Sequence, residues 1–398
     1  MAHGTAAPAQ ARRSQRPPFW RDVRVLRIAA QVAFLGLVGV ALWFLFSTLR
    51  TNLRNSGLTT GFDFLQQPAG VDIRDTDFRP GQPVRDAIVV GLTNTIRVAS
   101  VGLVLATILG VLVGIARLST NWLVRRGAAL YVESLRNVPV LVIIIFMYTA
   151  VVLRLPVITE AAEVLGLVVL SNRGLNVPWG EAQAGAGVFV GLLGVALAVA
   201  VGVALWRTRQ SERTGAPHHR FLWGLGTFVL VAVVAFVVLD GPVTVTLPAR
   251  EGRVVQGGIS MGPEYAALLF ALVLYTASHV AEIVRGSILA VPKGQTEAAN
   301  ALALSGFQRM RYVILPQAFR IIIPPLGNQY LNLTKNSSLA VAIGYFDLTR
   351  ISGQIIANGN PAPQVIGILM ACYLGLSLLI SAVANVVNRR LTLGGRRL

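Results

Sequence analysis

Long apolar runs without charge constrain the fold more than any other feature of this sequence. The first run, Ile28–Leu49, holds 22 residues without a charged side chain, and about 20 suffice for a helix to cross a bilayer. A basic segment of 27 residues precedes it, and the run is longer than the apolar part of a cleavable signal, so we expect a membrane helix. Only 13% of the residues are charged, against about a quarter in soluble domains.

The hydropathy pattern predicts an all-α polytopic membrane protein, because a helix satisfies its own backbone hydrogen bonds in hydrocarbon. We expect about eight spans, namely Ile28–Leu49, Ile88–Ala116, Val138–Leu153, Gly185–Trp206, Phe221–Leu239, Tyr265–Val284, Phe319–Gly344 and Gln364–Val387. The third is short and could begin nearer Ala128, and the seventh should be kinked or interrupted by Pro324 and Pro325. The outer loops around 50–87 and 154–184 should each hold a short amphipathic helix.

Lysine and arginine residues divide unequally between the two sides of these spans. One side, which includes both termini, collects 23 of them, and the other side collects 10. Positive residues favour the cytoplasmic side, so we expect both termini in the cytoplasm.

The net charge of +18 does not indicate nucleic-acid binding, because the arginines flank apolar runs instead of alternating with aromatic residues. The single cysteine, Cys372, excludes an intrachain disulfide. The sequence has no metal-ligand cluster, no nucleophile–base arrangement and no glycine-rich loop ending in lysine for ATP phosphates. We therefore expect no enzyme activity and no cofactor in this chain.

The cytoplasmic loop 285–316 is too polar to span and rich in helix-forming residues. Thr296 is a plausible N-cap for a helix over Glu297–Leu304. Gly306 permits a turn, and a second amphipathic helix should run from Phe307 until Pro316 stops it. The expected structure is a helix–turn–helix on the cytoplasmic face.

This loop resembles the EAA loop of permease subunits in bacterial ATP-binding-cassette importers. Glu297, Ala298 and Ala299 open the pattern, and Leu315 and Pro316 close it at the matching distance. The sequence departs where the family has glycine, since Ala303 stands there, and where it has isoleucine, since Val313 does. Alanine favours a helix more than glycine, which allows the first helix to continue to Gly306.

The resemblance implies that the loop is a coupling helix that docks on a separate ATPase subunit. ATP and Mg would then bind to that partner. An ordinary cytoplasmic loop with an accidental Glu-Ala-Ala is the alternative.

Further blocks resemble the polar amino-acid permeases of the histidine/glutamine type, among them Gly91–Ile96, Leu135–Val140, Ala281–Gly286 and Pro324–Gln329. The resemblance covers spans two, three, six, seven and eight, and the extra helices make the chain most like general L-amino-acid importer permeases. It implies a second homologous permease subunit, an ATPase dimer, a periplasmic amino-acid-binding protein and an L-amino-acid substrate as partners, besides membrane lipid.

The same resemblance divides the chain into four parts. Residues 1–84 hold the N-terminus, an extra helix and an outer loop. Residues 85–153 and 264–398 form the two parts of the permease core, and 154–263 an inserted pair of helices with outer loops.

Two cations lie inside predicted spans, Arg97 and Lys335. Such a cation is costly and usually faces a cavity or a partner, so we expect both to line the substrate path and to meet the carboxylate of an amino acid. Polar neighbours could line the same path, namely Asn94, Asn328, Asn332, Asn336, Ser337 and Ser338. The alternatives are that Arg97 reaches the membrane surface or pairs within the bundle, that the seventh span ends before Lys335, and that the amides bond between helices.

The function predicted from these observations is the permease subunit of an ATP-driven amino-acid importer. An ion-coupled secondary amino-acid transporter is the alternative, and it would be expected to carry buried acids and an inverted repeat. A membrane-bound enzyme is a further alternative that would need catalytic residues.

Overall fold

The computed structural model describes residue 20 and residues 22–55, 61–215, 219–252 and 254–393. The basic N-terminal segment and the C-terminal tail, for which a cytoplasmic location is predicted, lie largely outside the described residues. Most of the described chain is helical, as expected. The helices are α1 Val23–Asn55, α2 Val84–Ala116, α3 Trp122–Arg136, α4 Val140–Phe146, α5 Ala186–Thr214, α6 Arg220–Val238, α7 Pro263–Leu289, α8 Lys293–Ala301, α9 Gly306–Arg309, α10 Leu315–Asn336, α11 Leu348–Ala357 and α12 Ala362–Leu393.

Six helices are long and apolar enough to cross a membrane within the described residues, namely α1, α2, α5, α6, α7 and α12. The bent pair of α3 and α4 raises this number to seven if it forms one span. All of these match expected spans. The one expected span that is not among these helices is the seventh, which corresponds to α10, a helix of 22 residues. Arg320 and several amide side chains make α10 more polar than the others, so the count of eight stays a prediction.

The third expected span is not one straight helix. α3 ends at Arg136, and α4 begins at Val140 after a bend of 103°. The bend falls on Asn137, Val138 and Pro139, because proline disfavours helical backbone at the residue before it. The expected start near Ala128 therefore lies inside α3.

The expected interruption of the seventh span by proline was wrong. α10 continues through Pro324 and Pro325, and the change of geometry comes later, where a 3-10 helix covers Ser337–Ile343. The polar residues from Asn336 to Ser338 therefore lie at the junction of two kinds of helix.

The outer loops contain short strands that were not predicted. They are β1 Ala162–Val164, β2 Val168–Ser171, β3 Gly174–Val177, β4 Trp179–Ala182, β5 Val243–Thr246, β6 Ala249–Glu251, β7 Val254–Gln256 and β8 Ile259–Met261. They pair antiparallel in the orders β1-β2-β3-β8, β4-β5 and β6-β7. Instead of the expected amphipathic helices, the first outer loop has a 3-10 turn at Asp63–Gln66, and the second contributes β1 to β4 to these sheets.

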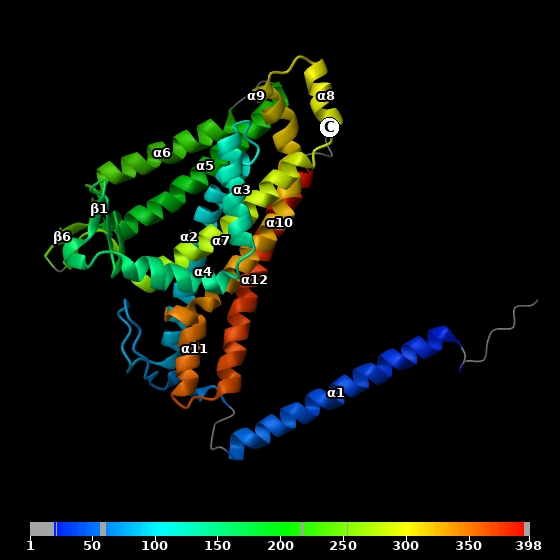
Figure 1. The fold of residues 1–398 in the computed structure, drawn as a ribbon, viewed down its shortest axis with the longest axis vertical. Helices are drawn as coiled ribbons and strands as arrows, with labels where there is room; N and C mark the ends of the chain where they lie inside the picture. Colours follow the sequence, from blue (N-terminus) through cyan, green and yellow to red (C-terminus); the bar gives the residue numbers. More distant parts are fainter. Residues whose placement is uncertain (1–19, 21, 56–60, 216–218, 253, 394–398) are drawn as a thin grey trace, which may run out of the picture.

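The helices form a bundle with a clear polarity along its length (Figure 1). The segment with α8 and α9 lies at one end and α11 at the other, while the hairpin of α5 and α6 lies beside the bundle. α1 stands apart from it, and none of its apolar stretch is buried.

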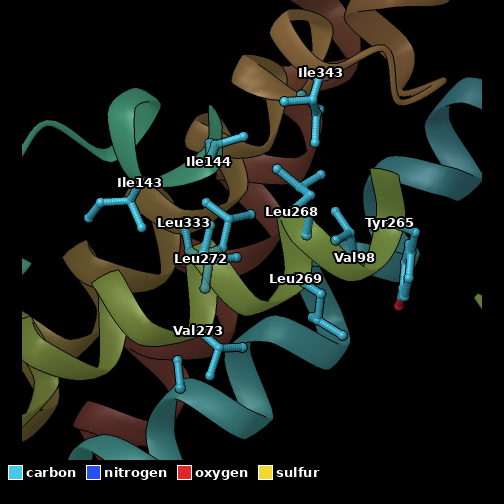
Figure 2. Close-up of a cluster of buried hydrophobic side chains, with 14 of the residues drawn as sticks. Val98, Ile143, Ile144, Tyr265, Leu268, Leu269, Leu272, Val273, Leu333 and Ile343 are labelled. Carbon is cyan, nitrogen blue, oxygen red and sulfur yellow. The ribbon is translucent and has the colours of Figure 1, made fainter. Parts of the chain in front are cut away.

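The core of the bundle depends on a close crossing of α2 and α7. Small residues on α2 face α7 at intervals of four, namely Gly102, Ala106, Gly110 and Gly114, and all are buried. Small residues at this spacing let two helix backbones approach closely. Leu268, Leu272 and Leu333 fill the neighbouring core, together with Ile143 and Ile144 of α4 (Figure 2).

Candidate functional site

The loop between α7 and α10 forms two short helices, but their boundaries differ from the prediction. The first helix, α8, begins at Lys293 after Pro292 and ends at Ala301. Thr296 is therefore inside the helix instead of at its N-cap. Ala303, expected to extend the helix, adopts a left-handed backbone conformation with φ of 53°. Glycine is the residue that usually takes this conformation directly after a helix. The residue at the family's glycine position thus ends the helix although it is alanine.

The second helix continues into α10 instead of stopping at Pro316. α9 starts at Gly306, where the side chain of Ser305 accepts a hydrogen bond from the Gln308 N–H and the Gln308 side chain accepts one from the Ser305 N–H. A π-helical turn over Met310–Ile314 then leads into α10, which begins at Leu315 with Pro316 in its first turn. Pro316 therefore lies within a continuous helical segment instead of ending one.

The segment 290–314, which we call the coupling segment after the role that the sequence predicts for it, presents apolar side chains beyond the bundle. Leu302 is 74% exposed and Phe307 71% exposed. Glu297 and Ala298 are also exposed, whereas Ala299 is buried. The large apolar side chains of Leu302 and Phe307 therefore lie on the surface of this segment.

At the opposite end of the bundle, a cavity of about 380 Å³ opens between α2, α7, α11 and the outer loops. Two of the predicted path residues line it, Asn94 and Arg97. The guanidinium of Arg97 lies 5.2 Å from the ring centre of Tyr265. The amide of Asn94 donates a hydrogen bond of 2.9 Å to the Phe346 carbonyl, which fixes α2 to the segment before α11.

The cavity contains equal numbers of basic and acidic side chains. The basic groups are Arg74, Arg97 and Arg350, and the acidic groups are Asp72, Asp75 and Glu264. The hydroxyl of Tyr148 donates a hydrogen bond of 3.2 Å to Glu264. Such a lining can contact a cation and an anion at the same time.

The remaining predicted path residues lie on α10 and the turn after it. Asn328, Asn332 and Lys335 are exposed and follow one another at intervals of four and three residues, so they share one face of the helix. Ser337 is buried, and Asn336 and Ser338 are half-buried. The structure therefore brings Arg97 and Asn94 together but places Lys335 on a separate, outward face.

Several residues of the cavity were missed from the sequence. Arg350 had been counted only among the positive residues of the outer side, and Glu264 and Tyr265 at the start of α7 gave no signal. Asp75 belongs to a loop that the fold brings beside α7.

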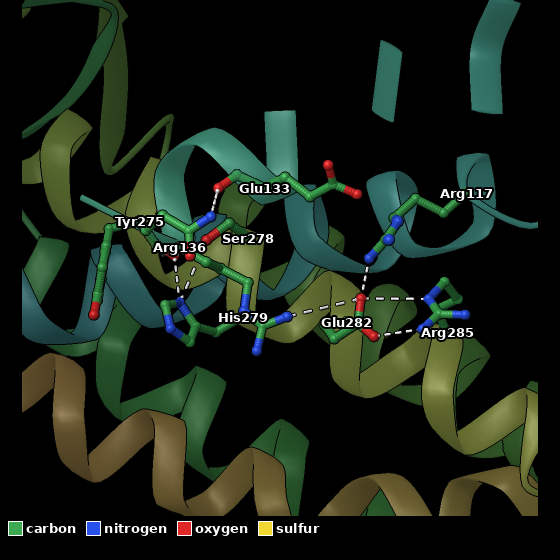
Figure 3. A network of polar contacts seen from close by, with 9 residues as sticks. Arg117, Glu133, Arg136, Tyr275, Ser278, His279, Glu282 and Arg285 are labelled. Atoms are coloured by element: carbon green, nitrogen blue, oxygen red, sulfur yellow. Dashed lines mark hydrogen bonds and ion pairs between the residues drawn. The ribbon is translucent and has the colours of Figure 1, made fainter. Parts of the chain in front are cut away.

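A polar cluster connects three helices near the coupling segment. Glu282 on α7 pairs with Arg117 after α2, with Arg136 at the end of α3 at 3.9 Å, and with Arg285 at 2.5 Å (Figure 3). Spacing in the sequence predicts two pairs of residues three apart, Glu133 with Arg136 and Glu282 with Arg285. The structure confirms the pair of Glu282 with Arg285, whereas Arg136 pairs with Glu282 instead of Glu133.

These features define a polytopic helical membrane protein with a charged cavity at one end and an exposed coupling segment at the other. Residues 106–393 match the family described as "binding-protein-dependent transport system inner membrane component". The chain therefore belongs to this family, and it is a multi-pass protein of an inner-membrane transport system.

Two relatives match the chain over nearly its whole length. The chain is 41% identical over 360 residues to the general L-amino acid transport system permease protein AapQ of Rhizobium johnstonii, which covers 90% of each protein. It is 36% identical over 416 residues to the glutamate/glutamine/aspartate/asparagine transport system permease protein BztB of Rhodobacter capsulatus, which covers 94% of this chain and 96% of that protein. A crystal structure of an amino acid ABC transporter with histidines aligns with 77% of this chain and 94% of that chain at 20% identity, with a TM-score of 0.47.

Proposed function

We propose that the chain is the permease subunit of an ATP-binding-cassette importer and forms part of the path of L-amino acids across the bacterial inner membrane. A separate ATPase dimer energises it, with ATP and Mg bound there, and a periplasmic binding protein delivers the substrate. A second, homologous permease subunit completes the path. The amino-acid relatives and the family support this assignment.

The observation that carries the proposal is the exposed coupling segment. Leu302 and Phe307 expose most of their apolar surface outside the bundle, and Glu297 stands exposed on α8 beside them. Burial of such side chains in the groove of a partner would remove this surface from water. α8 follows α7 after three residues, so a force on α8 acts directly on a helix of the core.

The test of this docking uses substitutions on the exposed tip. Leu302→Ser should weaken co-purification with the ATPase subunit about tenfold, since full burial of a leucine contributes about 1.5–3 kcal/mol. Glu297→Arg should abolish uptake while the protein still inserts into the membrane. Leu165→Ser is the matched control, because Leu165 is 89% exposed in an outer loop. Equal loss with Leu302→Ser and Leu165→Ser would remove the coupling segment from the mechanism.

The charged cavity supports a recognition site for the amino acid itself. Arg97 and Arg350 can contact an α-carboxylate while Asp75 or Glu264 contacts the α-ammonium group. Every α-amino acid carries both groups, so a site of this kind would serve acidic, neutral and basic substrates. Lys335, together with Asn328 and Asn332, would line the path at the surface that faces the second permease subunit.

The same proposal fixes the orientation, with both termini in the cytoplasm. It places Leu165 on the periplasmic side of the membrane and Leu302 on the cytoplasmic side. Single cysteines at these positions, in a Cys372→Ser background, are tested with an impermeant thiol reagent on spheroplasts. The reagent should label position 165 and leave position 302 unlabelled until the cells are opened, and the reverse pattern would overturn the orientation.

A further inference from the structure

One carboxylate on α7 holds the ends of two other helices close to the coupling segment. Glu282 pairs with Arg117, the residue that follows α2, and with Arg136, the last residue of α3 (Figure 3). α7 ends at Leu289, so Glu282 lies about two helical turns before the coupling segment. A displacement of α8 therefore reaches Glu282 through the three residues that join α8 to α7 and the last two turns of α7.

The cluster has a charge pattern that depends on this carboxylate. Three guanidinium groups surround Glu282, whose side chain is 26% exposed, and the Arg117 side chain is only 13% exposed. Burial and the neighbouring charges of Arg285 and Arg136 lower the pKa of Arg117, whereas the charge of Glu133 raises it, so the three cations are close enough to repel one another. Without the carboxylate, the three cations would drive the helix ends apart.

The two helices differ in how much they depend on Glu282. α2 packs closely against α7 at Gly110 and Gly114, and it also contacts Leu269 of α7 at Gly102. α3 contacts α7 through fewer groups, among them a hydrogen bond of 2.8 Å from the Tyr131 hydroxyl to the Leu274 carbonyl. Arg136 is also the last residue before the 103° bend into α4. The ion pair therefore attaches the bend of the third span to α7.

We propose that Glu282 is a positioning residue through which movement of the coupling segment reaches the bend between α3 and α4. With Glu282 paired, α7, the end of α2 and the bend move as one body. With the pair broken, α8 can follow the ATPase while α3 and α4 do not follow α7, so ATP is hydrolysed without transport. This inference rests on the proposed function.

The test uses the complete importer in proteoliposomes, with amino-acid uptake and ATP hydrolysis measured in the same vesicles. Glu282→Gln removes the charge and nearly keeps the shape of the side chain. The amount of amino acid moved per ATP should fall about tenfold, within the usual range of coupling between distant sites. Glu282→Asp should recover part of the ratio, because it keeps the charge.

Glu133→Gln is the matched control. Glu133 lies in the same cluster and is exposed, and among the residues that the structure describes it forms no ion pair. Its loss should leave the ratio unchanged. Arg136→Gln is the second variant, for the case in which Glu282→Gln does not assemble, and it should lower the ratio by removing only the link to α3.

Two results would overturn the inference. The first is that Glu282→Gln moves as much amino acid per ATP as Glu133→Gln. If Glu282→Gln does not assemble, Arg136→Gln takes its place in this comparison. The other is a proportional fall of uptake and ATP hydrolysis, which would assign Glu282 a merely structural role. Failure of the proposed function gives a different result, since the unsubstituted importer would then show no ATP-dependent uptake.

Discussion

The crossing of α2 and α7 leaves no room for a methyl group at Gly110, and Gly110→Ala tests this packing. A Cβ atom at position 110 would lie 2.5 Å from the Val280 Cβ and 2.9 Å from the Ala277 carbonyl oxygen. Ordinary van der Waals contact begins near 3.4 Å, so the two helices must separate by about 1 Å, which forfeits up to half of each contact energy across the crossing.

The expected cost follows from two opposing terms. Overpacking of a well-packed core costs about 1–3 kcal/mol, and alanine recovers up to about 1 kcal/mol of helix propensity. Gly110→Ala should therefore destabilise the protein by about 1–2 kcal/mol. Gly375→Ala in α12 is the control, because a Cβ there meets nothing within 4 Å, and it should leave stability equal or slightly raised.

The assay is thermal unfolding of the purified protein in detergent. Unfolding is monitored by a fluorescent reagent that reacts with the thiol of Cys372 when this side chain becomes exposed. Gly110→Ala should unfold at a lower temperature than both the unsubstituted protein and Gly375→Ala. If Gly110→Ala unfolds at the same temperature as Gly375→Ala, the close crossing of α2 and α7 is refuted.

Three further predictions concern single sites. Ala303→Gly should stabilise the end of α8 by about 1 kcal/mol, because alanine is strained at φ of 53°, and slower hydrogen exchange of the α8 amides is the measurement. Arg97→Gln and Arg350→Gln should lower uptake of glutamate, glutamine and arginine alike, whereas Lys335→Gln, outside the cavity, should lower it less; selective loss of one substrate would indicate side-chain recognition instead. Asp347, outside the candidate spans, is buried, and burial raises its pKa to about 6. In the folded protein, the Asp347 carboxyl group thus keeps its proton at a pH where the same group in the unfolded chain has lost it. The free energy of unfolding should therefore fall as pH rises from about 4 through 6, by up to about 3 kcal/mol. Asp347→Asn should remove this dependence, and the melting temperature measured across pH is the test.

Much of the fold was predictable because membrane spans follow from local composition. An apolar run such as Ile28–Leu49 has one stable structure in a bilayer, and α1 covers it. The bend at Pro139 and the continuous helix through Pro324 and Pro325 depend on neighbouring helices, which a sequence window does not contain. The strands of the outer loops escaped prediction because they are only three or four residues long.

The candidate site was predicted in part, for a related reason. Arg97 was found because a charge within an apolar run is visible in the sequence alone. Arg350, Asp75 and Glu264 lie outside such runs, so their charge carries no signal until the fold brings them around one cavity. Lys335 gave the same signal as Arg97, yet it lies on an outward face, because a pattern of polarity cannot tell a cavity from a surface that awaits a partner.

The two ends of α7 connect the parts of the proposed mechanism. Its first turn contributes Glu264 and Tyr265 to the cavity, and its last turns carry Glu282 and lead into α8. Between these ends, α7 is the most buried of the candidate spans, so it is packed on most sides and transmits displacement as a rigid rod. A helix in this position can change the cavity only by moving as a whole. Two contacts decide which neighbouring helices move with α7, namely the packing against the glycines of α2 and the ion pairs of Glu282. Coupling between the ATPase and the cavity should therefore be more sensitive to substitutions at these two contacts than to substitutions in the cavity lining, which should alter affinity and leave the transport per ATP unchanged.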